Sequence, residues 1–303
     1  MHHYSVFAAQ ALSNTLDENV VNALKVDIPR LAFEHEFLMH AVLLVAMVHL
    51  CCVDNSAERL PIFLYRDQAL RALRHAVTHL SSENIDALRG ASVLLAAVSF
   101  PTDRWTNQSG LWVTNWMALA LGQRNFRESY TPPGSGPFNN MESSTPSRGL
   151  YGCFANLLVP PVIPSTIQRA LEMNHQEDDI QYISTLKQVA AELGRLISIL
   201  KSPYETKFLE KNIKAWAFDV ISPEFITSVQ HNQPEALVVL GHYIALFRFL
   251  PGSWIYHGLP QHDIGIVVDV IDGKWKDHLS LPVSVIEMDD VEDAAALFAT
   301  CLE

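Results

Sequence analysis

Residues 234–249 form the part of the sequence that most restricts the fold. Drawn as a helix, this segment carries apolar side chains around nearly its whole circumference. A helix that is hydrophobic on all sides is stable in water only when other elements cover it. We therefore expect a buried core helix surrounded by further helices. Its polar side chains must find partners inside the protein, because an unpaired buried polar group costs about 1–3 kcal/mol.

A second apolar run extends over 17 residues, from Phe37 to Val53. His40 and His49 interrupt this run, and its length lies at the lower limit for crossing a bilayer. We predict a core helix here and no membrane-spanning segment. The N-terminus lacks a basic region followed by a long apolar stretch, so no secretory signal is expected.

The rest of the chain also shows mainly helical patterns. Alternation of apolar and polar residues is scarce, and the best strand candidate, residues 264–271, is equally compatible with a buried helix. Residues 130–149 are rich in Pro, Gly, Ser and Asn, which predicts a long central loop, either a divider of two helical halves or a lid. We predict a single all-α domain over residues 1–303 around an apolar ligand cavity. The other expected helices cover residues 22–50, 60–80, 110–121, 176–200 and 289–302, with one more that starts at Ser82 and ends at Pro101.

Charge and cysteine content exclude several classes of protein. The chain has 33 acidic and 21 basic residues, for a formal net charge of −12. An acidic surface repels phosphate backbones, so we expect no direct binding of nucleic acid. The four cysteines, at positions 51, 52, 153 and 301, form no evenly spaced framework. This pattern fits a reduced intracellular compartment, cytoplasmic or nuclear.

Several short motifs contain side chains of the types that bind metal ions in other proteins. Residues 289–293 read DDVED, which matches the DDxxD magnesium-diphosphate motif of class I terpene synthases. No second metal motif follows, and acidic residues also favour the N-terminus of a helix. A zinc site needs three or four ligands. We expect no metal ion and no cofactor. Three other groups could each supply part of a metal site, but the sequence designates no complete set of ligands for any of them. They are His75–His79, Glu36–His40 and residues 257–263.

Residues 100–116, FPTDRWTNQSGLWVTNW, combine charge with large aromatic rings. Asp103 and Arg104 lie between apolar residues, and Trp112 and Trp116 are one helical turn apart on one face. One interpretation is an ion pair that holds a loop, with both tryptophans in the core. The other is the wall of a pocket with a few convergent polar groups.

Four segments stand in a characteristic order along the chain. They are MHHYSVFAAQALS at 1–13, PRLAFEHEFLMHAVLLVAMVHL at 29–50, the stretch from YRDQAL to VSF at 65–100, and the stretch from ISPEF to IYHG at 221–258. Together they resemble the C-terminal regulatory domain of fungal binuclear zinc-cluster transcription factors, typified by yeast sterol-uptake regulators. The resemblance implies an all-α fold. In the sterol regulators it also implies a hydrophobic sterol pocket and a domain that can form a homodimer.

The resemblance bears on individual residues as well. His242 and Tyr243 form a His-Tyr pair that is common in the family, which favours a structural role, whereas Trp254, Tyr256 and His257 depart from its usual aromatic pattern. The candidate walls of the ligand pocket are Trp105, Trp112, Trp116, Tyr243, Phe247, Trp254 and Tyr256. If the protein is a catalyst, the proton donor or acid is expected among His242, His257, Tyr256, Asp103 and Arg104, because histidine is the side chain most easily tuned near neutral pH.

The family's DNA-binding module is missing from the sequence. That module needs six cysteines for two Zn²⁺ ions, and this chain has four, none near its start. We expect the chain to be either an excised domain or a standalone protein that has lost its DNA-binding module.

Three functions stay open. The first is a repurposed pocket that guides a cofactor-free, pericyclase-like cyclisation or isomerisation of a terpenoid, sterol or polyketide in fungal secondary metabolism. The second is a ligand-sensing regulatory domain that acts through partner proteins, and the third is an inert remnant. The methionine at position 1 favours the first. A ligand that emerges chemically changed indicates the enzyme, and one that emerges unchanged indicates the sensor.

Overall fold

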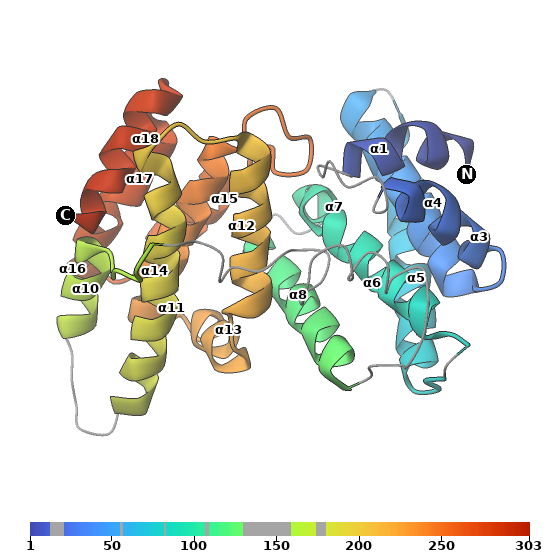
Figure 1. Ribbon diagram of the computed structural model, residues 1–303, viewed down its shortest axis with the longest axis horizontal. Helices are drawn as coiled ribbons and strands as arrows, with labels where there is room; N and C mark the ends of the chain where they lie inside the picture. Colours follow the sequence, from blue (N-terminus) through green and yellow to red (C-terminus); the bar gives the residue numbers. More distant parts are fainter. Residues whose placement is uncertain (13–20, 55–56, 82, 107–108, 130–158, 174–179) are drawn as a thin grey trace. The chain divides into compact units, whose positions relative to one another are not determined.

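The computed structural model describes residues 1–12, 21–54, 57–81, 83–106, 109–129, 159–173 and 180–303. All regular structure in these ranges is helical and none is strand, which confirms the all-α prediction (Figure 1). The predicted loop at 130–149 and the helix start expected at Ser82 lie outside them. The chain forms two compact units, Met1–Gln108 with Gly122–Gly152 and Ser109–Leu121 with Cys153–Glu303. The single domain expected over the whole chain stays a prediction.

The first unit is built around α4 (Glu36–Val53). This helix packs against α5 (Leu60–Val77) and α6 (Ile85–Ala97). It is long and apolar enough to cross a membrane, but 56% of its length is buried inside the protein. That burial is what a core helix requires. The other helices of this unit are η1 (Tyr4–Ala8), α1 (Ala9–Leu12), η2 (Ala23–Asp27), α3 (Ile28–Ala32) and α7 (Ser99–Thr106).

Two boundaries in the first unit differ from the predictions. The helix expected over residues 22–50 is interrupted, because the amides of Glu34 and His35 bond back to Leu31 and close α3 with a turn. The helix expected to end at Pro101 ends at Ala97 instead, and the chain bends by 54° into α7. Pro101 lies in the first turn of α7, where its missing N–H removes no helical hydrogen bond.

The second unit is built around α14 (Pro234–Leu246). Every residue from Glu235 to Leu246 is buried, which confirms the prediction of a core helix. Gly241 permits a close approach on one side, since a Cβ there would lie 2.5 Å from Leu279 Cδ2. The neighbours that pack against α14 are α10 (Ser165–Glu172), α11 (Ile180–Ser198), α13 (Pro223–Gln230), α15 (Leu259–Val270) and α17 (Ser280–Glu287).

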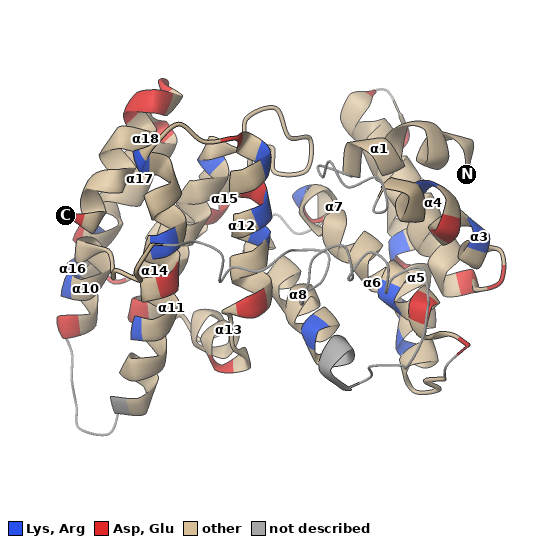
Figure 2. Ribbon diagram, in the orientation of Figure 1, with Lys and Arg blue, Asp and Glu red and all other residues tan. Residues whose placement is uncertain are grey.

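Further elements complete the second unit and connect these helices. The longest of them is α12 (Thr206–Asp219), which packs against α11. Acidic and basic residues both occur along α12 (Figure 2). The remaining elements are η5 (Ile199–Lys201), η6 (Phe247–Phe249), α16 (Gly273–Lys276), η7 (Asp277–Leu279), α18 (Val291–Ala299) and η8 (Thr300–Leu302).

The best strand candidate of the sequence, residues 264–271, is helical. It lies in α15, which begins after Gly258. The φ of Gly258 is 76°, a left-handed conformation that glycine adopts without a steric penalty. Pro260 then occupies the first turn of the helix, where proline is favoured. Turn chemistry at the start of the segment therefore outweighs its β-branched residues.

The helix expected at 110–121 is α8 (Trp112–Ser129), which is longer than predicted. Asp263 of α15 holds its first turn, because the carboxylate accepts hydrogen bonds from Trp112 N at 3.1 Å and Val113 N at 2.8 Å. All these residues belong to the second unit. A buried carboxylate thus satisfies two amides that have no partner within their own helix.

The DDVED segment also lies at the beginning of a helix. Asp290 accepts hydrogen bonds from the backbone amides of Glu292 and Asp293 and caps α18. This geometry supports the capping interpretation of the acidic cluster rather than the metal motif.

Replacing the two capping aspartates tests the role of Asp263. We expect Asp263→Ala to lower the free energy of unfolding by about 3 kcal/mol, because it leaves two buried amides unpaired. Asp290→Ala serves as the control and is expected to cost about 1 kcal/mol, since its amides stay accessible to water. Urea unfolding followed by tryptophan fluorescence measures both values. Equal losses in the two variants would contradict this account of Asp263.

Candidate functional site

The residues predicted for a site fall in both units. Asp103, Arg104 and Trp105 belong to α7 of the first unit. The others belong to the second unit. Each group is therefore described by itself. The members in the second unit are Trp112, Trp116, His242, Tyr243, Phe247, Trp254, Tyr256 and His257.

In the first unit, Asp103 lies in an ion pair between helices. Its carboxylate is 1% exposed and lies 2.5 Å from the guanidinium of Arg66 on α5. Arg66 also donates to Thr106 Oγ1 at 2.7 Å, so one guanidinium ties α5 to α7 at two points. Burial lowers the pKa of the half-buried Arg104. The Trp105 ring lies 5.1 Å from the guanidinium of Arg59, within cation–π range.

In the second unit, five rings pack into an aromatic cluster that we define as Trp116, Trp216, Tyr243, Phe247 and Tyr256. Their centroids lie 4.3 Å apart for Trp216–Tyr243, 5.3 Å for Tyr243–Phe247, 5.2 Å for Phe247–Tyr256 and 6.5 Å for Trp116–Phe247. All five side chains are buried. Such distances are typical of packed aromatic side chains. Four of the rings predicted as pocket walls, those of Trp116, Tyr243, Phe247 and Tyr256, therefore belong to this cluster, and Trp254 is half-buried.

His242 is completely buried and uses both ring nitrogens. Nδ1 donates to Val238 O at 2.8 Å, and Nε2 accepts from Thr166 Oγ1 at 2.6 Å. Burial is the main cause that lowers the pKa of His242 to about 4. The imidazole is therefore neutral at neutral pH, and it joins α14 to α10. This arrangement matches the structural role implied by the resemblance.

The Tyr256 hydroxyl donates to Glu210 Oε1 at 2.9 Å. Glu210 is buried, and the Lys214 ammonium group lies 2.7 Å from the same oxygen. Tyr256 thus connects the loop after η6 to α12, while its ring joins the aromatic cluster. His257, the next residue, is exposed. The structure therefore separates two neighbouring candidate donors into a buried tyrosine and a surface histidine.

Sequence reasoning did not predict the contact between Trp112 and His262. The two rings are stacked with centroids 3.7 Å apart, and His262 Nδ1 lies 2.7 Å from Asp263 Oδ1. Burial raises the pKa of the Asp263 carboxyl, while the hydrogen bonds from His262, Val113 and Trp112 oppose this rise. Trp112 is buried in this packing rather than presented to solvent. No local pattern signals the contact, because the partners are 150 positions apart.

The described part of the chain contains no group of three or more His, Cys, Asp or Glu residues that could hold a metal ion. The rings of His75 and His79 stack with centroids 4.8 Å apart, and His79 Nδ1 donates to His75 O in the last turn of α5. His40 lies 4.0 Å from Glu36. These pairs are explained by ordinary contacts between residues four positions apart on a helix.

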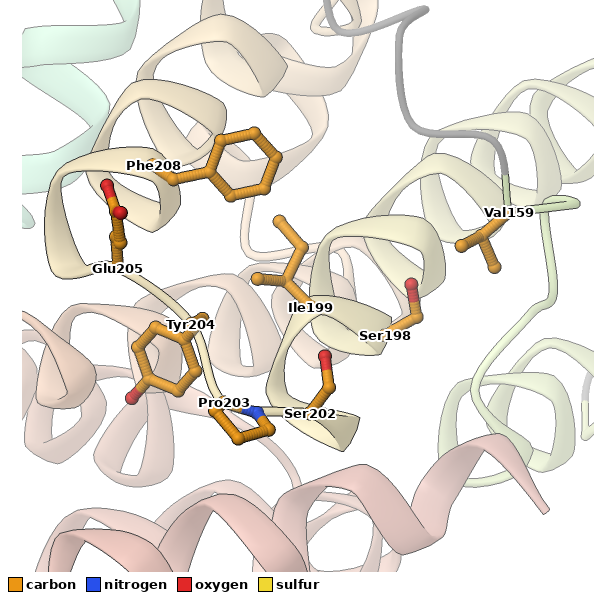
Figure 3. A pocket seen from close by; sticks show the side chains of 8 residues that line it. All are labelled: Val159, Ser198, Ile199, Ser202, Pro203, Tyr204, Glu205 and Phe208. Carbon is orange, nitrogen blue, oxygen red and sulfur yellow. The ribbon is translucent and has the colours of Figure 1, made fainter.

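The second unit contains a pocket of about 520 Å³ where α11 ends and α12 begins. That volume lies within the range of small-molecule sites, about 300–1,000 Å³. Figure 3 shows Ile199 and Phe208 pointing toward one another. None of the residues predicted for a site lines this pocket. Its lining is Val159, Ser198, Ile199, Ser202, Pro203, Tyr204, Glu205 and Phe208.

The pKa of His242 predicts a contribution to stability that depends on pH. The unfolded chain binds a proton near the ordinary histidine pKa of 6.5, whereas the folded protein does so only near 4. The contribution is present above pH 6.5 and is lost as the pH falls toward 4. Between pH 7 and pH 4.5 we expect this histidine to remove about 2 kcal/mol of stability.

Comparison with His242→Gln isolates this contribution, because the other titrating groups are common to both proteins. Urea unfolding at the two pH values should show a smaller loss in the variant than in the wild type, by about 2 kcal/mol. His257→Gln is the control, since its exposed side chain is in water in both states. An identical pH dependence in His242→Gln and wild type would contradict the description of His242.

Comparison with known proteins identifies relatives for part of the chain. No family model matches it. It is 34% identical over 129 residues to sterol uptake control protein 2 of Candida albicans, which covers 40% of this chain and 17% of that protein. It is 30% identical over 125 residues to the Zn(2)-C6 fungal-type transcription factor afumD of Aspergillus fumigatus, which covers 40% of this chain and 34% of that protein.

A third match supports the same relationship. Sterol uptake control protein 2 of Saccharomyces cerevisiae is 41% identical over 68 residues, which are 22% of this chain and 7% of that protein. The matched regions are thus a small part of each relative. They confirm the resemblance drawn from the sequence: about 40% of this all-α chain is a region homologous to fungal transcription factors.

Proposed function

We propose that this chain is a ligand-sensing regulatory region of the fungal transcription-factor kind, which acts in the cytoplasm or nucleus through partner proteins. The observation that carries the proposal is the similarity of about 40% of the chain to transcription factors, one of them named for control of sterol uptake. The all-α fold agrees with that role.

The ligand proposed for this region is a sterol or another hydrophobic small molecule, such as a terpenoid or polyketide. The names of two relatives favour a sterol. A regulatory region needs a ligand that binds one of its conformations better than another. An apolar molecule suits such a role, because its binding free energy increases with the apolar area that it buries in the conformation it prefers.

The candidate catalytic residues give less support to a cyclase or isomerase. Both nitrogens of His242 are engaged in hydrogen bonds, and Tyr256 donates to Glu210. His257 is exposed, and Asp103 pairs with Arg66. A general acid must reach the substrate within hydrogen-bond distance. His242, Tyr256 and Asp103 serve the packing of the protein, so we propose regulation in place of catalysis.

A reporter assay tests the regulatory proposal. The chain is fused to an unrelated DNA-binding module in yeast, and transcription of a reporter is measured before and after sterol synthesis is inhibited. We expect the signal to change about fivefold or more, which is the lower range for coupling between a ligand and an output.

Two controls make the result interpretable. The DNA-binding module alone should give a constant signal, and immunoblotting should show equal amounts of the fusion protein under both conditions. Adding sterol back should restore the original signal. A signal that stays constant throughout, at equal protein amount, would overturn the proposal of sterol sensing.

A further inference from the structure

We propose that the junction of α11 and α12 is a docking surface for a partner protein, which presents an acidic peptide segment with a large apolar side chain at its centre. This inference rests on the proposed function, in which the chain acts through partner proteins, and it gives the chemistry of one such partner. Three observations support it: a local excess of exposed lysines, an apolar pocket beside them, and the spacing of the lysines around that pocket.

The exposed charge of this junction is opposite in sign to that of the whole chain. The sequence has 33 acidic and 21 basic residues, so most of the protein repels an acidic partner. Between positions 201 and 211 the balance is reversed. The exposed charged residues there are Lys201, Lys207, Lys211 and Glu205. A basic surface on an acidic protein attracts a negatively charged partner and orients its approach.

These three lysines have their charges available to a partner. In the part of the chain that the structure describes, none of them forms an ion pair. Lys214, one helical turn beyond Lys211, differs from them, because it lies 2.7 Å from the buried carboxylate of Glu210. A carboxylate of the partner can therefore approach the exposed lysines without breaking an ion pair between described residues.

An apolar pocket adjoins these charges. Lys201 directly precedes Ser202, and Lys207 directly precedes Phe208, and both of these neighbours line the pocket of about 520 Å³. Phe208 and Val159, which also lines it, are 45% and 41% exposed, although both are large apolar side chains. An apolar side chain that covers them removes this surface from water, which is favourable in proportion to the area covered. The pocket therefore fits the apolar anchor of a peptide.

The spacing of the lysines places charge on both chain segments that form the pocket. An α-helix turns by about 100° per residue, so Lys211 lies about 40° from Lys207 and about 60° from Phe208 around the axis of α12. These three side chains thus share one arc of that helix. Lys201 belongs to η5, at the end of α11. Carboxylates on the two sides of an apolar anchor therefore have a cationic partner on each segment.

The number of lysines favours a peptide over other anionic ligands. A fatty acid has an apolar body but a single carboxylate, which can pair with only one of the three ammonium groups. A nucleic acid carries many phosphates, but the formal net charge of −12 repels its backbone. A peptide combines several carboxylates with a large apolar side chain, and such side chains provide much of the binding energy at protein interfaces.

The experiment compares three fluorescein-labelled peptides by fluorescence polarisation with the full chain in buffer of low ionic strength. The first, GDEDLFDEDG, has acidic residues on both sides of an apolar pair. The second, GNQNLFNQNG, replaces every acid by its amide, and the third, GDEDAADEDG, replaces the apolar pair by alanine. We expect the first peptide to bind about tenfold more tightly than either of the others, because only it combines charge with an anchor.

Charge reversal tests the role of the lysines. The double variant Lys207→Glu with Lys211→Glu should weaken binding of the first peptide by about tenfold or more, since it converts attraction into repulsion. The double variant Lys187→Glu with Lys276→Glu makes the same change in net charge at exposed positions of the second unit outside the pocket lining. It should keep an affinity close to that of the wild type.

Truncation of Phe208 tests the role of the pocket. Phe208→Ala should weaken binding of the first peptide about fivefold and leave the alanine peptide unaffected, because only the first peptide places an apolar side chain on this wall. Phe208 is partly exposed, so its loss should leave the fold intact. Circular dichroism checks the fold of every variant.

No binding of the first peptide, or equal affinities for the three peptides, would overturn the proposal. Equal losses in the two double variants would also overturn it, because the effect would then come from net charge alone. The same holds if decanoate or a DNA duplex displaces the peptide at equal concentration, since another class of ligand would then fit the surface as well.

The reporter assay is independent of these measurements. A sterol-dependent reporter signal together with a negative result here would remove the docking surface and leave the sensing function in place. Specific peptide binding together with a constant reporter signal would leave the docking surface and remove sterol sensing.

Discussion

The complete burial of α14 is the constraint on which the second unit depends. A helix with no exposed side requires neighbours on every face, and five helices supply them. Burial also obliges its polar side chains to find internal partners, since each unpaired group costs about 1–3 kcal/mol. His242 meets this requirement through Val238 and Thr166, and Tyr243 donates to Ile213 O at 2.9 Å. The polar groups of α14 therefore fix the positions of α10 and α12.

The same constraint explains how much of the fold could be predicted. The helix α11 could be located from its apolar periodicity, and α14 from its apolar circumference, because burial and pattern agree in both. Boundaries set by turn chemistry could not, as the interruption before α4 and the helical form of residues 264–271 show. The Asp263 cap on α8 was also beyond sequence reasoning. A cap supplied by a residue 150 positions away leaves no local signal.

The residues of a ligand site stay a prediction, and there is a physical reason why a sequence assigns them less surely than a core helix. Large aromatic residues contribute equally well to a core and to a pocket wall, because both environments favour apolar area. Trp116, Tyr243 and Phe247 were assigned to a wall, and the structure packs them into the aromatic cluster. The lining of the pocket depends instead on residues such as Ser202 and Glu205, which are ordinary surface residues by sequence. Only the turn between η5 and α12 brings them together.

The central claim is that the chain holds a hydrophobic ligand in order to sense it. Native mass spectrometry of protein purified from a fungal host tests this claim most directly, because gentle ionisation preserves a bound lipophilic molecule. We expect a mass adduct that corresponds to one neutral apolar molecule, released unchanged after incubation with an excess of the same compound. The claim would be contradicted if the protein carries no adduct even after incubation with an excess of a sterol. It would also be contradicted if the protein converts the bound compound into a product of different structure.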